Sequence, residues 1–204
     1  MGRALAACVL VLALVMPAYG QQDKPAGTVD RLVGAATATR AGITRALGMG
    51  VNVFVGDRIA TGGDTRLHLR LASGASIALG DNSSISIEAV EAKDIGHSVL
   101  KFFEGVMLAV SAAVTGPPTD SMAIKTPVAV LGIRGTEVWA EQQPDHLGVI
   151  MLSGTSVLVT APEGAVELDA PLLGTDVFAG KAPTVPKTWG QKRIDAARRS
   201  VAFQ

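Results

Sequence analysis

Residues 65–71 read TRLHLRL, and this stretch predicts the fold class of the chain. Leucine occupies every second position, and arginine or histidine occupies the positions between the leucines. Because successive side chains of a β-strand point to opposite faces of a sheet, this alternation is typical of a strand with one buried and one exposed face. The serine and glycine at 73–74 then predict a turn into a second strand.

The same alternation continues from about Thr28 to Phe178. We predict turns at residues 73–74, 80–82, 104–105, 142–145 and 153–154, a loop at 116–118, and strands between them that include 99–103, 106–114, 149–152 and 156–160. Short strands joined by tight turns indicate an all-β domain rather than alternating strands and helices. We predict a meander of short antiparallel hairpins that forms a sandwich, a barrel or a solenoid-like β domain. Periodicity alone does not choose among these three.

The composition agrees with a folded β domain. Of the 204 residues, 48% are hydrophobic and 18% are charged, which is enough apolar material for a sizeable core. The 23 glycines and 10 prolines favour tight turns and argue against a helical bundle. The formal net charge is zero, so the chain lacks the basic excess of a nucleic-acid-binding domain, and we expect no nucleic-acid partner.

Residues 1–20 have the pattern of a secretory signal peptide. Arg3 is followed by an apolar run from Ala4 to Val15 and by the small residues of a cleavage site that ends at Gly20. Cys8 lies in a stretch that resembles a lipoprotein box, but most of the apolar run follows the cysteine instead of preceding it. We therefore predict cleavage after Gly20, a periplasmic or secreted location, and no membrane span in the mature chain.

Removal of the signal peptide would also remove Cys8, which is the only cysteine of the chain. The mature protein would then have no disulfide, no thiolate metal ligand and no cysteine nucleophile. Its stability would come from packing and hydrogen bonds.

The C-terminal region, residues 181–204, differs in character from the β region. After a proline-containing linker, residues 188–202 predict a short helix in which Ile194, Ala197 and Val201 form an apolar stripe. Residues 21–180 hold eleven basic and seventeen acidic residues, whereas residues 181–204 hold six basic residues and one acidic residue. Two interpretations remain open: a basic helix docked on its own acidic domain, or a helix offered to a partner or an anionic membrane surface.

No catalytic constellation is recognisable. Two Gly-x-Ser-like stretches lack the final glycine of a nucleophile elbow, and no phosphate-binding loop is present. His68, His97 and His146 are too far apart to give a metal-ligand spacing. We expect a protein that is not an enzyme and that uses no cofactor or metal.

The most specific stretch is residues 124–138, which read IKTPVAVLGIRGTEV. Gly132 and Gly135 permit positive φ angles or close packing, and Pro127 restricts Thr126 to an extended conformation. These features predict a kinked pair of strands on either side of the glycines.

Arg134 lies between the two glycines of this stretch. Its guanidinium group carries five donors, and we expect it to bind a carboxylate, with Asp57 or Glu104 as candidates. Direct contact with a ligand is the alternative role for Arg134.

Together with VGDRIATG at 55–62, LASGASIAL at 71–79, FFEG at 102–105 and the valine-rich residues 149–159, this stretch resembles the FecR domain family. The resemblance spans about residues 27–180, and the turn at 72–74 lacks the aspartate that is usual in the family. The motif positions, which we expect to be structural or binding residues, are Asp57, Arg58, Thr61, Gly62, Thr126, Pro127, Gly132, Arg134, Gly135 and Thr136.

The resemblance implies an all-β extracytoplasmic domain at residues 27–180, between a signal peptide at 1–20 and a linker with a basic helix at 181–204. Founding members of the family are periplasmic sensors that signal through a membrane span to a cytoplasmic segment holding a sigma factor, with input from a TonB-dependent receptor. This sequence shows no counterpart of that segment or span after signal cleavage, so we do not expect direct sigma-factor control.

Two functions are consistent with these observations. The first is an exported, non-catalytic FecR-like protein that binds a partner protein, or a small or polymeric ligand, in the cell envelope, in a sensing or signalling context. The alternative is a structural envelope component that assembles through strand edges or through its basic tail.

Overall fold

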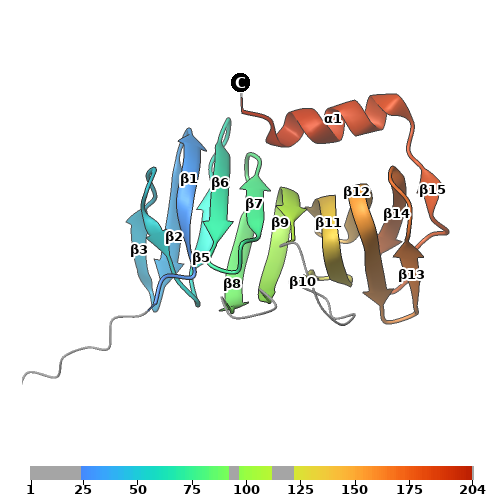
Figure 1. Cartoon of the computed structure of the whole chain (residues 1–204), viewed down its shortest axis with the longest axis horizontal. Helices are drawn as coiled ribbons and strands as arrows, with labels where there is room; N and C mark the ends of the chain where they lie inside the picture. Colours follow the sequence, from blue (N-terminus) through green and yellow to red (C-terminus); the bar gives the residue numbers. More distant parts are fainter. Residues whose placement is uncertain (1–23, 92–96, 112–121, 204) are drawn as a thin grey trace, which may run out of the picture.

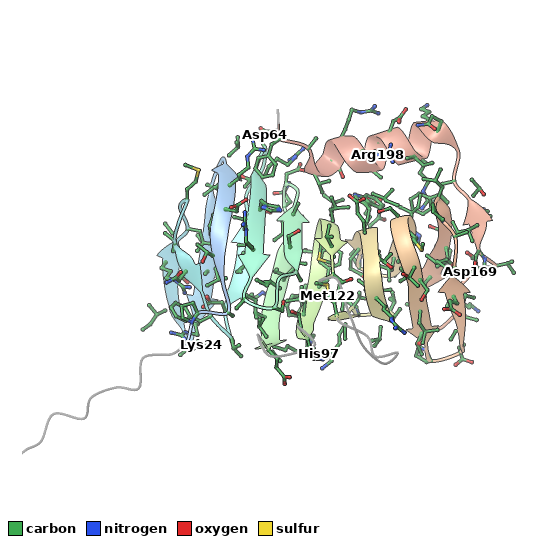
Figure 2. All side chains as sticks on the ribbon, in the orientation of Figure 1. Lys24, Asp64, His97, Met122, Asp169 and Arg198 are labelled. Atoms are coloured by element: carbon green, nitrogen blue, oxygen red, sulfur yellow. The ribbon has the colours of Figure 1, made fainter. Side chains whose placement is uncertain are left out.

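A computed structural model describes residues 24–91, 97–111 and 122–203 (Figure 1). The predicted signal peptide, Cys8 and the predicted loop at 116–118 lie outside the described residues. Within these residues, fifteen strands form one continuous hydrogen-bonded sheet, and one helix, α1 (Gln191–Val201), follows them. Lys24 and Asp169, labelled in Figure 2, lie at opposite ends of the row of strands.

The sheet is folded into two layers, because the halves of three long strands pair with different neighbours. Layer A contains, in spatial order, β3 (Ile43–Ala46), β2 (Ala36–Arg40), β5 (Arg58–Thr61), β8 (Ser84–Val90), the first half of β9 (Ser98–Val110), β10 (Met122–Lys125), the first half of β11 (Val130–Gln143), the second half of β12 (His146–Ala161) and β13 (Gly164–Leu168). Layer B contains β4 (Asn52–Val53), β1 (Gly27–Val33), β6 (Arg66–Leu71), β7 (Ser76–Leu79), the other halves of β9, β11 and β12, β14 (Leu173–Phe178) and β15 (Lys187–Thr188).

The core lies between the two layers. Alternate residues of each strand face inward and form one apolar cluster, to which layer A contributes residues such as Ile59 and Phe102 and layer B contributes residues such as Leu69 and Met107. The three alternating leucines of β6 are all buried, which confirms the strand predicted from TRLHLRL. The all-β prediction is confirmed, and the described strands form an open sheet that does not close into a barrel.

The predicted turns at 104–105 and 153–154 are wrong, because the chain bends there without leaving the sheet, whereas the kink predicted at Gly135 is confirmed as a bend of the same kind. The glycines at the bends, Gly105 in β9, Gly135 in β11 and Gly154 in β12, have φ angles of +94°, +55° and +115°. A left-handed residue redirects a strand sharply, and each strand passes from one layer to the other at its glycine. Residues 99–103 and 106–110 are therefore one strand, and residues 149–152 and 156–160 form no hairpin.

The connection from β9 to β10 adds a parallel pair to the otherwise antiparallel sheet. Met122 to Lys125 of β10 pair in parallel with Ser98 to Lys101 of β9. The chain therefore makes one full coil around the core here, from layer A through layer B and back to layer A. The predicted meander of hairpins is wrong at this point, because sequence periodicity does not report strand direction.

Helix α1 covers the outer face of layer B and runs along the row of strands (Figure 1). Its buried residues are the predicted stripe, Ile194, Ala197 and Val201. They pack on Trp139 of β11 and on other outward-facing apolar residues of β7, β9 and β12. Of the two interpretations, the structure has the apolar side of the helix docked on its own domain. Within the described residues, no helix is both long and apolar enough to cross a membrane.

Candidate functional site

Asp57, the first residue of the proposed motif, is fully buried just before β5. Its carboxylate accepts hydrogen bonds from both Nη atoms of Arg45, at 2.9 and 2.5 Å, and from the backbone N–H of Phe54 at 2.8 Å. Arg40 Nε lies 3.9 Å away. Burial by itself raises the pKa of Asp57, but the hydrogen bonds from Arg45 and Phe54 and the charges of Arg45 and Arg40 lower it overall. Asp57 is thus an ionised group that fixes the β2–β3 hairpin to the end of the core.

The arginines of this cluster also line a surface hollow of about 540 Å³. Both guanidinium groups lie over the ring of Phe54, at 4.6 Å for Arg40 and 5.6 Å for Arg45. Ile43, which completes the hollow with Ala41, is 73% exposed. Because Asp57 holds Arg45 from within, the hollow presents an apolar and cationic surface with no acid–base pair in its lining.

Arg58, the next motif residue, points to the outer face of layer A. Its Nε atom donates a hydrogen bond to Ser84 Oγ at 3.2 Å, and its guanidinium group lies 4.3 Å from the centre of the Phe103 ring. Lys101 Nζ lies 5.3 Å from the same ring. The aromatic pair predicted at 102–103 is divided between the faces, since Phe102 is buried in the core and Phe103 is half-buried outside it.

Thr61 and Gly62 lie at the opposite end of β5, at one rim of the sheet, which we call the Ser83 rim. Buried Thr61 Oγ1 donates to the carbonyl of Gly80 at 2.7 Å and accepts from the backbone N–H of Ser83 at 2.9 Å. Ser83 Oγ in turn accepts from the N–H of Val106 at 2.9 Å, beside the bend of β9. Gly62 accepts a backbone hydrogen bond from Asn82. These hydroxyl groups satisfy the backbone where strands cross between layers.

The other rim, which we call the Thr136 rim, is built in the same way. Thr136 Oγ1 donates to the carbonyl of Arg134 at 2.6 Å, or to that of Ser156 at 3.1 Å, and accepts from the N–H groups of Thr155 and Ser156 at 3.1 and 3.2 Å. A Cβ atom at Gly154 would lie 2.4 Å from Thr136 Cα, so only glycine fits. Gly135 and Thr136 thus join the bends of β11 and β12.

The remaining motif residues of this stretch shape layer A. Thr126 Oγ1 accepts hydrogen bonds from the N–H groups of Val128 and Ala129, which closes the turn at Pro127 between β10 and β11. Gly132 does not bend the chain. It lies within β11, opposite Ala123 and Leu158.

The expected carboxylate partner of Arg134 is not found. Asp57 is bound by Arg45, and no carboxylate among the described residues lies within ion-pair distance of Arg134. Arg134 is half-exposed on the outer face of layer A, opposite Ser156. The prediction was wrong because β5 and β11 belong to the same layer with three other strands between them, which the sequence does not reveal.

A second polar cluster, which sequence reasoning missed, attaches α1 to β14. Asp176 accepts two hydrogen bonds from Arg193, at 2.6 and 3.1 Å, and lies 3.1 Å from His146 Nε2. The hydrogen bonds from Arg193 lower the pKa of Asp176 against the effect of burial, and the charge of Arg193 and the contact with His146 add to this. Arg193 also lies 3.3 Å from the ring centre of buried Trp189. We call these four residues the helix clasp.

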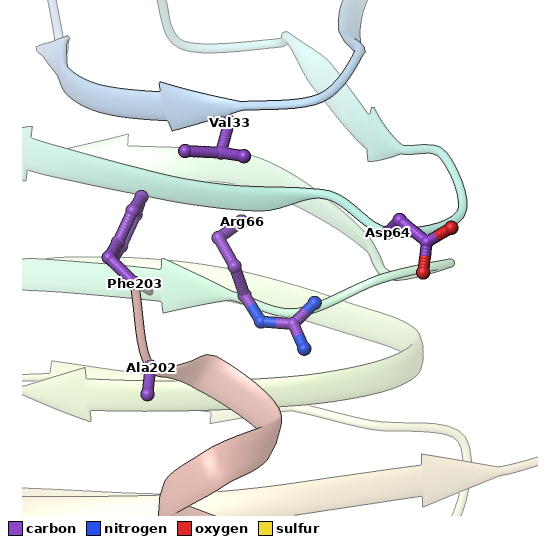
Figure 3. A pocket seen from close by; sticks show the side chains of 5 residues that line it. All are labelled: Val33, Asp64, Arg66, Ala202 and Phe203. Carbon is purple, nitrogen blue, oxygen red and sulfur yellow. The ribbon is translucent and has the colours of Figure 1, made fainter.

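A pocket of about 300 Å³ lies where the chain leaves α1 (Figure 3). Ala202 and Phe203 line one side, and Val33, Asp64 and Arg66 line the other. Arg66 donates to the carbonyl of Thr65 at 2.7 Å and lies 3.3 Å from Asp81, while Arg31 lies over the Phe203 ring. The lining combines a guanidinium, a carboxylate and apolar groups, which suits contact more than bond-breaking chemistry. The described residues contain no group of three or more side chains able to hold a metal ion.

A sequence signal for the rims does exist. A serine or threonine stands beside several glycines of the rims, as in Thr61–Gly62, Gly135–Thr136 and Gly154–Thr155, although Gly105 has Glu104 and Val106 as its neighbours. The arginine partners of Asp57 and the helix clasp have no such local signal, because their members are far apart in the sequence.

The folded two-layer sheet, with glycine bends and buried hydroxyl groups at its rims, defines the class of this all-β domain. The family model described as FecR protein matches residues 57–157, and the chain is therefore a FecR-domain protein. The same sheet continues on both sides of the match, from Gly27 of β1 to Thr188 of β15. No curated protein matched the chain.

Two crystal structures of a "putative anti-sigma factor" from Parabacteroides distasonis share the fold. Each has a TM-score of 0.56 and 17% sequence identity over 68% of this chain. The matched parts are 62% and 63% of those chains, so the present chain spans about three-fifths of that protein's length. At this identity the likeness shows the fold alone.

Proposed function

We propose that this chain is an exported FecR-domain protein without catalytic activity, which binds a partner protein or a ligand in the cell envelope in a signalling-related role. One observation carries the proposal: the buried polar groups of the family motif are occupied inside the fold. Asp57, Thr61 and Thr136 all bond to neighbouring backbone or side chains of the same domain. Function is then left to the outer surface.

The comparisons support the signalling context. The chain carries a FecR domain, and a protein of the same fold is described as an anti-sigma factor. Export is supported by the sequence of residues 1–20, which has the charge, apolar run and small residues of a cleavable signal. A periplasmic or secreted protein of this kind acts by contact, with no cofactor or metal.

The proposal is tested in native envelope fractions. The tagged full-length protein is crosslinked in intact cells and recovered, and partners are identified by mass spectrometry against a tagged unrelated exported protein. We expect the recovered chain to begin at Gln21 and to carry a specific partner. Recovery from the cytoplasm, or turnover of a substrate that is lost when one polar side chain is replaced, would contradict the proposal.

A second candidate function, assembly through strand edges, is favoured by the end of layer A at β3. This strand pairs only with β2 among the described strands, and Ile43 on it is 73% exposed. Open edges are sites of strand addition. Size-exclusion chromatography of the full chain, of Ile43→Lys, and of a chain lacking residues 186–204 tests this candidate. A concentration-dependent oligomer that Ile43→Lys dissolves would support it, and a monomer in all three would refute it.

A further inference from the structure

The outer face of layer A carries a row of four side chains in register, three of which are cationic. The register places Arg58 opposite Ser86, Ser86 opposite Lys101, and Lys101 opposite Lys125 on the parallel neighbour β10. The row therefore crosses four adjacent strands, β5, β8, β9 and β10. No described helix covers this face, since α1 packs on layer B.

This row is incompletely neutralised within the described part of the molecule. Lys125 binds Glu88 at 2.7 Å, whereas Arg58 and Lys101 have no carboxylate within ion-pair distance among the described residues. Arg58 and Lys101 instead share the ring of Phe103, which brings two positive charges together. The like charges of Arg58 and Lys101, on the two strands that flank β8, repel each other, so an external anionic group on this row would relieve the repulsion.

The row continues into an apolar area. Val130 of β11 lies opposite Lys125 and is 43% exposed, and Leu158 of β12 is 44% exposed. Gly132 lies in register between Leu158 and Ala123. Because glycine has no side chain, a partner can approach the backbone of β11 closely at this position. An aliphatic pair beside a charged row is the composition of a protein interface.

The opposite face of the molecule shows how such a surface is filled. Helix α1 crosses the strands of layer B above Gly80, Gly148 and Gly174, where a Cβ atom would lie 2.2–3.0 Å from the nearest neighbouring atom. A charged residue of the helix, Arg193, anchors it to Asp176 on the sheet. Close approach at glycines, an apolar stripe packed on the sheet and an ion pair at its side thus hold α1 across this layer.

We propose that the outer face of layer A docks an acidic amphipathic helix of a partner protein, which crosses the strands as α1 crosses layer B. This inference rests on the proposed binding function and names the surface and the chemistry of the partner. Carboxylates at one end of the helix would lie on Arg58 and Lys101, and apolar side chains at the other end would lie on Val130 and Leu158. The span from β5 to β12 is about 24 Å, or about 16 helical residues.

The test is photo-crosslinking in native cells with p-benzoylphenylalanine in the full-length protein. The probe replaces Ser86, which lies in the cationic row, or Ala196, which is exposed on α1. We expect a protein adduct from position 86 whose linked peptide is acidic with apolar residues at helical spacing. Adducts only from position 196 would overturn the inference and leave the proposed function standing. No protein adduct from either position or from a panel over the remaining surface would overturn both.

Charge variants test the chemistry of the contact. In the position-86 protein, Arg58→Glu with Lys101→Glu should lower the adduct yield at least about tenfold, because like charges across an interface are strongly unfavourable. Arg58→Lys with Lys101→Arg keeps the charge and should retain the adduct. Lys192→Glu with Arg199→Glu makes the same change in net charge on α1 and should also retain it.

The remaining outcomes are decisive as well. An unchanged yield in the Arg58→Glu, Lys101→Glu protein, or an adduct with a lipid, a glycan or the chain itself, would overturn the inference. If that variant fails to fold, the unsubstituted charges are tested by crosslinking in envelope extracts at low and high salt, where screening should reduce the position-86 adduct and spare an adduct from position 196.

Discussion

The two outer faces of this molecule share the same three long strands, yet within the part of the chain that the structure describes a helix covers one face and not the other. In layer B the outward positions of β11 and β12 hold Trp139, Ile150 and Leu152, which α1 covers. In layer A the outward positions of the same strands include Arg134 and Leu158, which remain exposed or half-exposed. The bends at Gly135 and Gly154 separate an apolar half of each strand from a mixed half. The helix is therefore part of the fold on one side, while no helix among the described residues covers the other side.

The largest expected effect comes from the covered face. Trp189 is 4% exposed, packs edge-on against Trp139 with ring centres 6.0 Å apart, and lies under Arg193. Trp189→Ala should lower the free energy of unfolding by about 3–5 kcal/mol, as for other buried aromatic residues. Urea denaturation measures the change. Leu158→Ala on the bare face is the control and should cost less than about 1 kcal/mol. Equal costs at both positions would show that the two faces contribute alike.

No described helix covers layer A, and the Asp57 cluster lies at the end of its core. Asp57→Ala removes the shared acceptor of Arg45 and Phe54 and should cost about 3 kcal/mol, because cationic partners of a buried carboxylate lose their compensation. The double variant Asp57→Ala, Arg45→Ala should recover part of the loss, since the guanidinium group that Asp57 binds most closely is then absent as well. The free energies of unfolding of the two single variants and the double variant, measured by denaturation, complete a double-mutant cycle. Purely additive costs would contradict a direct interaction.

The hydroxyl groups of the rims bond the two layers together. Thr136→Val keeps the shape of the side chain and removes the group that serves Thr155 and Ser156, so stability should fall by about 1–3 kcal/mol. Thr155→Val, at an exposed position on the same rim, should change stability by less than about 0.5 kcal/mol. Thermal unfolding of both variants compares them. A similar small effect at both positions would mean that the rim hydrogen bonds do not stabilise the crossing.

Much of this arrangement follows from local sequence. The period of two in TRLHLRL placed β6 and its buried face correctly, and the apolar stripe of residues 194–201 placed the docked side of α1. The glycines at 105, 135 and 154 were identified as special positions, but a glycine with positive φ serves a tight turn and a strand bend equally well. Only the pairing of both halves with different neighbours distinguishes the two, and pairing is not local.

The partners of charged groups could not be predicted for the same reason. Arg134 and Asp57 belong to one family motif set, which suggested a contact, yet the sheet order places β8, β9 and β10 between their strands. Asp57 instead meets Arg45, twelve residues earlier, through the β2–β3 hairpin. The helix clasp joins residues of β12, β14 and α1 with Trp189 of the segment before the helix. Ion pairs depend on the three-dimensional order of the strands, which hydrophobic periodicity does not encode.

Acid should weaken the covered face through the helix clasp. The pKa of Asp176 is lower in the folded protein than its ordinary value, so its stabilising contribution is complete above that ordinary value, about 4, and is lost as the pH falls through the folded pKa. The melting temperature should therefore drop more steeply below pH 4 in the wild type than in Asp176→Asn, which cannot lose this contribution. Differential scanning calorimetry from pH 6 to 3 measures the slope of melting temperature against pH for both proteins. Parallel slopes would assign the acid sensitivity to Asp57 and other groups.

The smallest expected effect lies on the bare face. Arg134 has no carboxylate within ion-pair distance among the described residues, and its half-exposed guanidinium group remains hydrated, so removing it strands no buried charge. Arg134→Ala should therefore change the free energy of unfolding by less than about 0.5 kcal/mol, although this arginine stands in the most specific stretch of the sequence. Urea denaturation of Arg134→Ala and of Gly135→Val compares the two neighbours. Gly135→Val should lower the free energy of unfolding more, because Gly135 has a left-handed φ that is strained for a β-branched residue. A large loss at Arg134 would instead place a buried partner for it beyond the described residues, and would make the bare face as structural as the covered one.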